Sequence, residues 1–271
     1  MSQDRDYVLG THDEEIERLG LQHSVWRPRA ADAWRRAGFT AGQTLLDVGC
    51  GPGYATLDLA GIVGPGGRVV GIDRSRRFLD AAAAAASARG IGHVEWIEQD
   101  LDEHDLPSLG AHGAWSRWVY AFVRDPKRLL ERVAAALRPG GTMVLYEYVD
   151  YRAWRLSPRR PEFEAFVDEV MASWREHGGE PDIALELPRW LGELGFTVRE
   201  LRPLVYAAGP ADFVWQWARA FVDVGLRRLV ELGRIDAARG EAIVNAFRSS
   251  QATPGAFLVT PTVLEIIAVK P

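Results

Sequence analysis

One stretch of the chain decides its fold: Leu45-Leu46-Asp47-Val48-Gly49-Cys50-Gly51-Pro52-Gly53. The apolar residues before Asp47 are typical of a buried strand, and the three alternate glycines predict a turn that leads into a helix. Glycine adopts backbone angles that a side chain forbids, and it lets a ligand approach the backbone closely. The dinucleotide fingerprint GxGxxG does not fit, because its third glycine would fall at Tyr54. The stretch is either a tight strand-to-helix turn or a cofactor loop, and the alternate glycines behind Asp47 favour the cofactor loop.

Around this turn, residues 43–148 alternate short β-rich runs with helical stretches. Such alternation is typical of βαβ units around a parallel sheet. One helix is predicted to begin after Asp125, because Asp125 can cap it and Pro126 suits its first position. We expect strands near residues 43–48, 67–72, 92–98, 113–119 and 142–148.

The flanking segments have a different pattern, with aromatic helices in place of the alternation. Residues 10–37 predict two short helices joined around Arg27-Pro28, and the apolar spacing over Glu162–Glu176 predicts a one-sided helix. Residues 210–232 carry two apolar stripes, and a helix that is apolar on two sides is usually covered on two sides. A helix over 187–194 precedes the last two expected strands. These strands are placed at 196–205 and 263–269.

These patterns predict a single α/β domain with a core and a helical cap. The 271 residues are enough for one large core with a cap, and two independent domains are not required. We expect the core to comprise residues 38–150, 179–209 and 256–271. We expect the cap to comprise residues 1–37, 151–178 and 210–255.

Composition narrows the classes of partner and compartment. The net charge of -5, from 37 acidic and 32 basic residues, argues against nucleic acid as a partner. Cys50 is the one cysteine, so the chain forms no internal disulfide and no four-cysteine zinc site. The acidic start of the chain does not resemble a secretory signal, and no run of 18 apolar residues occurs. We therefore expect a cytoplasmic protein that does not act in a membrane.

Four motifs in order resemble those of class I S-adenosylmethionine-dependent methyltransferases. The first is Asp47-x-Gly49-x-Gly51-x-Gly53, and the second is the strand 69–73 that ends in Asp73. The third is Gln99-Asp100-Leu101, and the fourth is the turn Leu137-Arg138-Pro139-Gly140-Gly141. The resemblance covers residues 43–148 and, within the family, is closest to the ubiquinone and menaquinone biosynthesis methyltransferases. It does not extend to a quinone substrate.

The resemblance implies a Rossmann-like fold with seven mostly parallel strands, helices on both faces and a helical cap. It also implies S-adenosyl-L-methionine as cofactor and S-adenosyl-L-homocysteine as product. In the family, the loop passes under the methionine and ribose, an acid like Asp73 holds the ribose hydroxyls, and an acid like Asp100 takes the adenine amine. We add Arg27 as a possible partner of the cofactor carboxylate. The predicted cofactor-binding residues are Asp47, Gly49, Cys50, Gly51, Gly53, Asp73, Arg74, Asp100, Leu101, Ser116 and Arg27.

The fourth strand ends in Ser116-Arg117-Trp118, whereas DNA and RNA amino-methyltransferases carry Asn/Asp-Pro-Pro-aromatic there. This difference removes the most specific argument for a nucleic-acid base as acceptor. The aromatic rings of Phe213, Trp215 and Trp217 suit a small acceptor that is flat or largely apolar. A general base is optional, because the sulfonium methyl is already activated. His23 is either a candidate base or a packed histidine, and Glu147 either faces the acceptor or is solvated. The candidate catalytic residues are His23, Glu147 and Tyr148, and the candidate pocket residues are Trp26, Trp118, Tyr120, Tyr151, Phe213 and Trp217.

The predicted function is therefore transfer of a methyl group to an O, N or C atom of a small acceptor, without a metal. Two alternatives stay open: a non-catalytic S-adenosylmethionine-binding regulator, and a methyltransferase of a macromolecule. The sequence does not give the oligomeric state or the identity of the acceptor.

Overall fold

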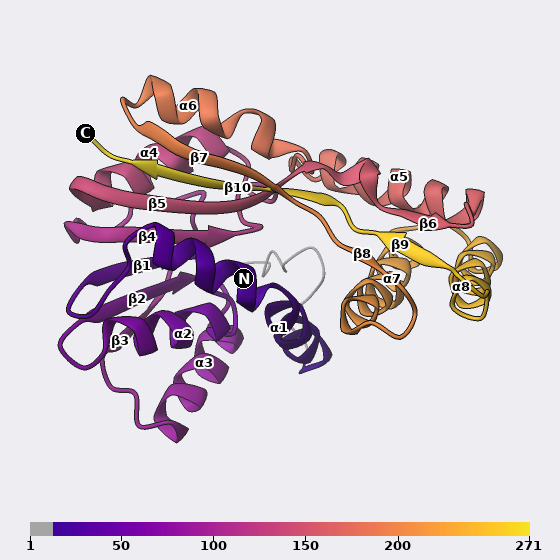
Figure 1. Cartoon of the computed structure of the whole chain (residues 1–271), viewed down its shortest axis with the longest axis horizontal. Helices are drawn as coiled ribbons and strands as arrows, with labels where there is room; N and C mark the ends of the chain where they lie inside the picture. The colour runs from indigo at the N-terminus through magenta and orange to yellow at the C-terminus, as the bar shows by residue number, and fades with distance from the viewer. Residues whose placement is uncertain (1–12) are drawn as a thin grey trace, which may run out of the picture.

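The computed structural model describes residues 13–271 and builds them around a seven-stranded sheet (Figure 1). The strand order is β3-β2-β1-β4-β5-β10-β7. In this order, all neighbours from β3 through β2, β1 and β4 to β5 pair in parallel. Strand β10 pairs antiparallel with both β5 and β7. The prediction of seven mostly parallel strands is confirmed. The strands are β1 (Thr44–Val48), β2 (Arg68–Asp73), β3 (Val94–Glu98), β4 (Ala111–Arg117), β5 (Leu137–Asp150), β7 (Thr197–Leu204) and β10 (Thr262–Val269).

Helices cover both faces of this sheet. Successive strand residues point to opposite faces, so Leu45 joins one hydrophobic cluster and Leu46 joins the other. The first cluster includes α1 and α2, and the second includes α4 and α6. Within residues 13–271, no helix is long and apolar enough to cross a membrane. The helices around the sheet are α1 (Asp13–Arg36), α2 (Tyr54–Val63), α3 (Arg76–Ala88), α4 (Pro126–Ala136) and α6 (Leu187–Glu193).

The predicted start of α4 is confirmed. The side chain of Asp125 accepts a hydrogen bond from the backbone N–H of Arg128 at 2.9 Å, and Pro126 occupies the first position. Proline costs nothing there, because the first N–H groups of a helix have no partner within it. Ser75 caps α3 in the same way, through the N–H of Phe78.

The remaining helices gather beyond the end of the sheet at which β5 leaves it and β10 enters (Figure 1). They are α5 (Pro161–Glu176), α7 (Phe213–Glu231) and α8 (Ala237–Gln251). Helix α7 packs against α1, α5 and α8, and this packing covers its two apolar stripes except at Phe213. A second sheet, of order β6-β9-β8, runs through the same region. Its strands β6 (Arg155–Ser157), β8 (Ala207–Ala208) and β9 (Phe257–Val259) are too short to show a period, and the sequence did not predict them.

The prediction of two short helices before residue 38 is wrong. One helix, α1, runs from Asp13 to Arg36 and contains Pro28. A proline inside a helix removes one backbone hydrogen bond and costs about 3 kcal/mol. The helix continues because Trp26, Ala30 and Trp34 are at most 1% exposed on its buried side. Packing on both sides of the proline therefore outweighs the local preference to stop.

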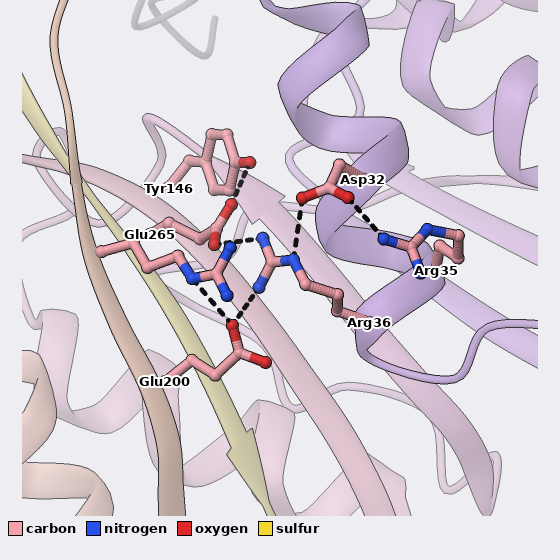
Figure 2. A network of polar contacts seen from close by, with 7 residues as sticks. Asp32, Arg35, Arg36, Tyr146, Glu200 and Glu265 are labelled. Carbon is pink, nitrogen blue, oxygen red and sulfur yellow. Dashed lines mark hydrogen bonds and ion pairs between the residues drawn. The ribbon is translucent and has the colours of Figure 1, made fainter.

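The end of α1 is attached to the sheet by a network around Arg36 (Figure 2). Its guanidinium pairs with Glu200 of β7 and Glu265 of β10, and its Nε donates to Asp32 at 2.8 Å. The Tyr146 hydroxyl of β5 donates to the same Glu265 at 2.5 Å. Only 2% of the Glu265 side chain is exposed, so this carboxylate depends on its partners within the protein.

Candidate active site

The loop between β1 and α2 keeps its glycines in the left-handed region. The φ angles are +67° at Gly49 and +52° at Gly51. A Cβ at Gly49 would lie 2.3 Å from Cγ2 of Val119, so a side chain does not fit. A Cβ at Gly51 would meet no atom within 4 Å and would project into open space. The loop therefore presents bare backbone at Gly51, as a cofactor cradle requires.

Asp73 ends β2 beside this loop and holds it in place. Its Oδ2 accepts the N–H of Gly51 at 2.8 Å, and its Oδ1 accepts the N–H of Ser75 at 2.8 Å. Burial raises the pKa of Asp73, and the two N–H donors oppose that rise. A carboxylate offers about four acceptor positions, so two hydroxyl donors of a ligand can still bind it.

Asp47, the acid of the first motif, has a different place. It is 2% exposed, and its Oδ2 accepts the hydroxyl of Thr56 at 2.6 Å. Burial raises the pKa of Asp47 to about 7. Asp47 therefore joins β1 to α2 from beneath the loop and does not line the cavity above it.

That cavity has a volume of about 1200 Å³ and lies at the carboxyl ends of the parallel strands. Ligands of open α/β sheets bind at this edge. Asp100 lines it after β3 and accepts the N–H of Asp102 at 2.8 Å. The predicted residues that line the cavity are Gly49, Gly51, Asp73, Arg74, Asp100, Leu101 and Trp118.

S-adenosylmethionine fits this set of residues. Gly51 leaves its space free, and Asp73 and Asp100 present carboxylate acceptors to the cavity, which suits a ligand that carries hydroxyl and amino groups. Leu101 is apolar and 8% exposed, as suits contact with a flat base. Among the residues that the structure describes, no group of three His, Cys, Asp or Glu side chains is arranged to hold a metal ion.

Several predicted cofactor residues lie outside the cavity. Cys50 packs under the loop, with its N–H donating to Ile72 at 2.9 Å, and Gly53 caps α2. Ser116 is 1% exposed, and its hydroxyl lacks a partner among the described residues. Arg27 is 61% exposed and pairs with Asp58 at 2.7 Å.

Glu147 is not solvated, which rules out one of the two interpretations that the sequence allowed for it. It is fully buried, and its Oε1 accepts the N–H groups of Val119 and Tyr120 at 2.7 and 3.0 Å. Burial raises the pKa of Glu147 to about 8, against the opposing effect of these donors. The side chain holds the segment after β4, but it does not line the cavity.

His23 is packed between two charged groups. Its Nε2 lies 3.0 Å from Oδ2 of Asp58, and its Nδ1 lies 3.4 Å from Nη2 of Arg117. Burial lowers the pKa of His23, and the hydrogen bond to Asp58 opposes that effect. The ring is 6% exposed and does not line the cavity, whereas Arg117 does.

Trp118 is the one non-glycine residue from 13 to 271 with a positive φ, at +54°. Such strain concentrates at functional sites, where the surrounding structure enforces it. The Trp118 ring stacks on Tyr148 and on Trp217, with centroid distances of 5.2 and 5.9 Å, and Trp26 meets it edge-on at 5.4 Å. Trp118 lines the cavity, while these three other rings form the layer behind it.

The other predicted pocket residues do not reach the cavity. Tyr120 and Tyr151 are fully buried or nearly so, and Tyr151 packs against Tyr148 and Trp174. Phe213, at the start of α7, is 49% exposed. Helices α5 and α7 contribute no lining residue, and the cap reaches this cavity through Leu19 and Gln22 of α1.

Sequence reasoning missed Leu19, Gln22, Arg117 and Phe122 as lining residues. The first two share a helical face with His23 and Trp26, at spacings of three, four and seven residues, and that pattern was readable. Arg117 stands at a predicted strand end, where the sequence alone does not show what its charge meets. Only the folded structure shows that this charge has no counter-ion among the described residues.

Comparison with protein families gives one match over the core. Residues 45–141 match a family described as a methyltransferase domain. Nocamycin O-methyltransferase of Saccharothrix syringae is 37% identical over 132 residues, which cover 48% of this chain and 46% of that protein. Demethylmenaquinone methyltransferase of Lactococcus lactis is 30% identical over 135 residues, covering 46% and 49%. The match thus spans about half the length of these curated relatives.

Solved structures share the fold over most of the chain. A putative methyltransferase from Bacillus halodurans has a TM-score of 0.60 at 18% identity, covering 89% of this chain and 98% of that one. Geranyl diphosphate C-methyltransferase from Streptomyces coelicolor, solved with S-adenosyl-L-homocysteine, also has a TM-score of 0.60, at 17% identity, covering 92% and 77%. At identities this low, the similarity shows only a shared fold.

Proposed function

We propose that this chain, whose residues 45–141 are a methyltransferase domain of class I fold, transfers a methyl group from S-adenosylmethionine to a small molecule. The observation that supports this most is the shared cavity, to which Gly49, Gly51, Asp73 and Asp100 all contribute. The acceptor is an O, N or C atom of an aromatic or apolar compound. Trp118 and Phe122, which also line the cavity, suit such a body.

When bound, the cofactor supplies a methyl group that its sulfonium already activates. The chain therefore mainly has to align the acceptor and exclude water. Asp73 orients the ribose, Asp100 and Leu101 hold the adenine, and the bare backbone at Gly51 allows close approach. None of His23, Glu147 and Tyr148 lines the cavity, so the proposal uses alignment and assigns no general base.

We also propose that residues 38–150, 179–209 and 256–271 form the core of the domain and that the other segments form its cap. A cytoplasmic location is also proposed, because a single cysteine suits a reducing compartment. The net charge of -5 supports a small molecule over nucleic acid as partner.

Calorimetry with S-adenosylmethionine tests the cofactor assignment. Charge-assisted hydrogen bonds contribute about 1.5 to 3 kcal/mol each, so Asp73→Asn should weaken binding at least about tenfold. Asp80→Asn is the matched control, since Asp80 lies on α3, is 62% exposed and does not line the cavity. Tighter binding of NADH than of S-adenosylmethionine by the wild type would overturn the assignment.

Turnover separates an enzyme from a regulator. The protein is incubated with S-adenosylmethionine and a panel of aromatic small molecules, and S-adenosylhomocysteine is measured by mass spectrometry. We expect product to depend on the acceptor. Binding without product from any small molecule would favour the regulator, and product only with a protein or RNA fraction would favour a macromolecular acceptor.

A further inference from the structure

Arg117 is a largely buried cation that lines the cavity and has no counter-ion among residues 13–271. Its Nη1 is fully shielded from solvent and has no hydrogen-bond partner among residues 13–271. No carboxylate in that part of the chain forms an ion pair with it, although the same structure pairs Arg36 with three acids. Burying an unpaired charge costs several kcal/mol. An anion bound at the side of Arg117 that faces the cavity would offset that cost.

The neighbours of Arg117 hold it without neutralising it. His23 of α1 lies 3.4 Å from Nη2, and the guanidinium carbon lies 5.2 Å from the centroid of the Trp118 ring. Asp47 and Asp58 act on it only through longer-range attraction. Burial lowers the pKa of Arg117 to about 10, so the side chain still carries its charge at neutral pH.

Asp58 determines which ring nitrogen of His23 carries the hydrogen. Burial disfavours the charge on Asp58, but hydrogen bonds from His23 and Arg27 hold its pKa below the usual value. The ionised carboxylate therefore accepts a hydrogen bond from the Nε2–H of His23, which leaves the Nδ1 lone pair facing Nη2 of Arg117. This contact orients the guanidinium and leaves Nη1 unpaired.

We propose that Arg117 binds a carboxylate or similar oxyanion of the methyl acceptor, an inference that rests on the proposed function. Arg117 is the last residue of β4, on the other side of β1 from the ends of β2 and β3, where Asp73 and Asp100 lie. It adjoins the aromatic wall at Trp118 and the cap helix α1. The volume of about 1200 Å³ exceeds the roughly 300 to 1000 Å³ of single-ligand pockets, leaving room for an acceptor beside the cofactor. The cofactor's own carboxylate is the other source of such a group, and the experiment separates the two.

The first arm compares benzoate with benzamide, which have the same shape but differ in charge. Each is added in millimolar excess to protein saturated with S-adenosylhomocysteine, and the melting temperature is measured. Benzoate should raise it by about 2 °C or more above benzamide in the wild type. Arg117→Met should abolish the difference. Arg234→Met should keep it, because Arg234 is paired with two acids and does not line the cavity. An equal effect of both compounds in the wild type, or a difference that survives in Arg117→Met, would overturn the proposal.

The second arm measures calorimetric affinities for S-adenosylhomocysteine and for 5′-methylthioadenosine, which lacks the carboxylate. If the acceptor supplies the anion, Arg117→Met should change both by less than about threefold. A loss of tenfold or more for S-adenosylhomocysteine alone would assign Arg117 to the cofactor and overturn the acceptor assignment.

The third arm needs no ligand. Arg117→Met removes an unpaired buried charge, so the melting temperature of the free protein should stay equal or rise, whereas Arg36→Met should lower it by about 5 °C or more. A comparable fall in Arg117→Met would mean that the arginine is structural, contrary to the proposal. If the wild type does not bind S-adenosylhomocysteine, the proposed function fails. The benzoate comparison without it then still judges Arg117.

Discussion

Gly51 combines a left-handed backbone with open space on the side of the cavity. Gly42 has the same kind of backbone, with φ +79° and no atom within 4 Å of the position that a Cβ would take, but it does not line the cavity. A side chain at either position strains the backbone by about 1 to 2 kcal/mol or more. Only at Gly51 would it also occupy the space of a ligand.

Gly51→Val should therefore abolish binding of S-adenosylmethionine, while Gly42→Val should cost similar stability and leave binding intact. Calorimetry measures the affinity, and thermal melting shows that both variants are folded. Unchanged affinity in a folded Gly51→Val protein would contradict the assignment of this loop.

Glu147 should make stability depend on pH. Its pKa is about 8 in the folded protein, against 4.5 for an ordinary glutamate, because burial disfavours the charge. Between these values the folded state binds more protons than the unfolded state, so the free energy of unfolding falls as the pH rises. Glutamine at this position cannot titrate, and its oxygen can still accept the N–H groups of Val119 and Tyr120.

The stability of Glu147→Gln relative to wild type should thus rise between about pH 5 and pH 8, on the order of 1 kcal/mol per pH unit. Urea unfolding at several pH values measures it. The exposed Glu162→Gln variant controls for the general loss of one carboxylate. A pH-independent difference for Glu147→Gln would show that its folded pKa is ordinary.

At the scale of elements, the sequence predicted the strands that are apolar runs and the helices that have a clear period. The central strands were found because burial on both faces makes them short continuous apolar runs, and α5 because burial on one side imposes a period of 3.6. The break predicted at Pro28 was wrong, because a local rule gave way to packing at Trp26 and Trp34. The strands β6, β8 and β9 have two or three residues each, which is too few for any period.

Pro28 should destabilise α1, so that replacing it should stabilise the protein. It is exposed and lies inside the helix, where it leaves the carbonyl of Ser24 without its usual partner. Pro28→Ala should raise the free energy of unfolding by roughly 1 to 2 kcal/mol, since greater freedom of the unfolded chain offsets part of the gain. Pro126→Ala, at the first position of α4, should bring no such gain. A loss of stability in Pro28→Ala by thermal melting would show that α1 needs its proline.

At the scale of the whole molecule, the cavity-lining residues at the ends of β1, β2 and β3 were predictable, and those on α1 were not. Gly49, Asp73 and Asp100 follow directly from strand ends, and strand ends of a parallel sheet meet at one edge. Leu19 and Gln22 reach that edge only because α1 crosses from the core to α7. The same packing places Trp217 behind Trp118, one layer from the cavity where it was predicted.

The attachment of α1 to the sheet should depend on Arg36, which contacts residues far along the chain. Arg36→Met leaves Glu265 buried without its cation, and such a loss costs about 3 to 5 kcal/mol. Glu265→Gln should cost less, because Arg36 keeps Glu200 and Asp32 and the amide oxygen can still accept the Tyr146 hydroxyl.

The double variant Arg36→Met/Glu265→Gln removes the cation and the most buried of its acids together. It should lose at least about 1 kcal/mol less than the sum of the single variants, because neither leaves the other unpaired. Urea unfolding of the four proteins closes this cycle. Additive losses would mean that Arg36 stabilises the molecule through Glu200 and Asp32 alone. In that case the first helix would be tied to the edge strand β7 and not to β10 in the interior of the sheet.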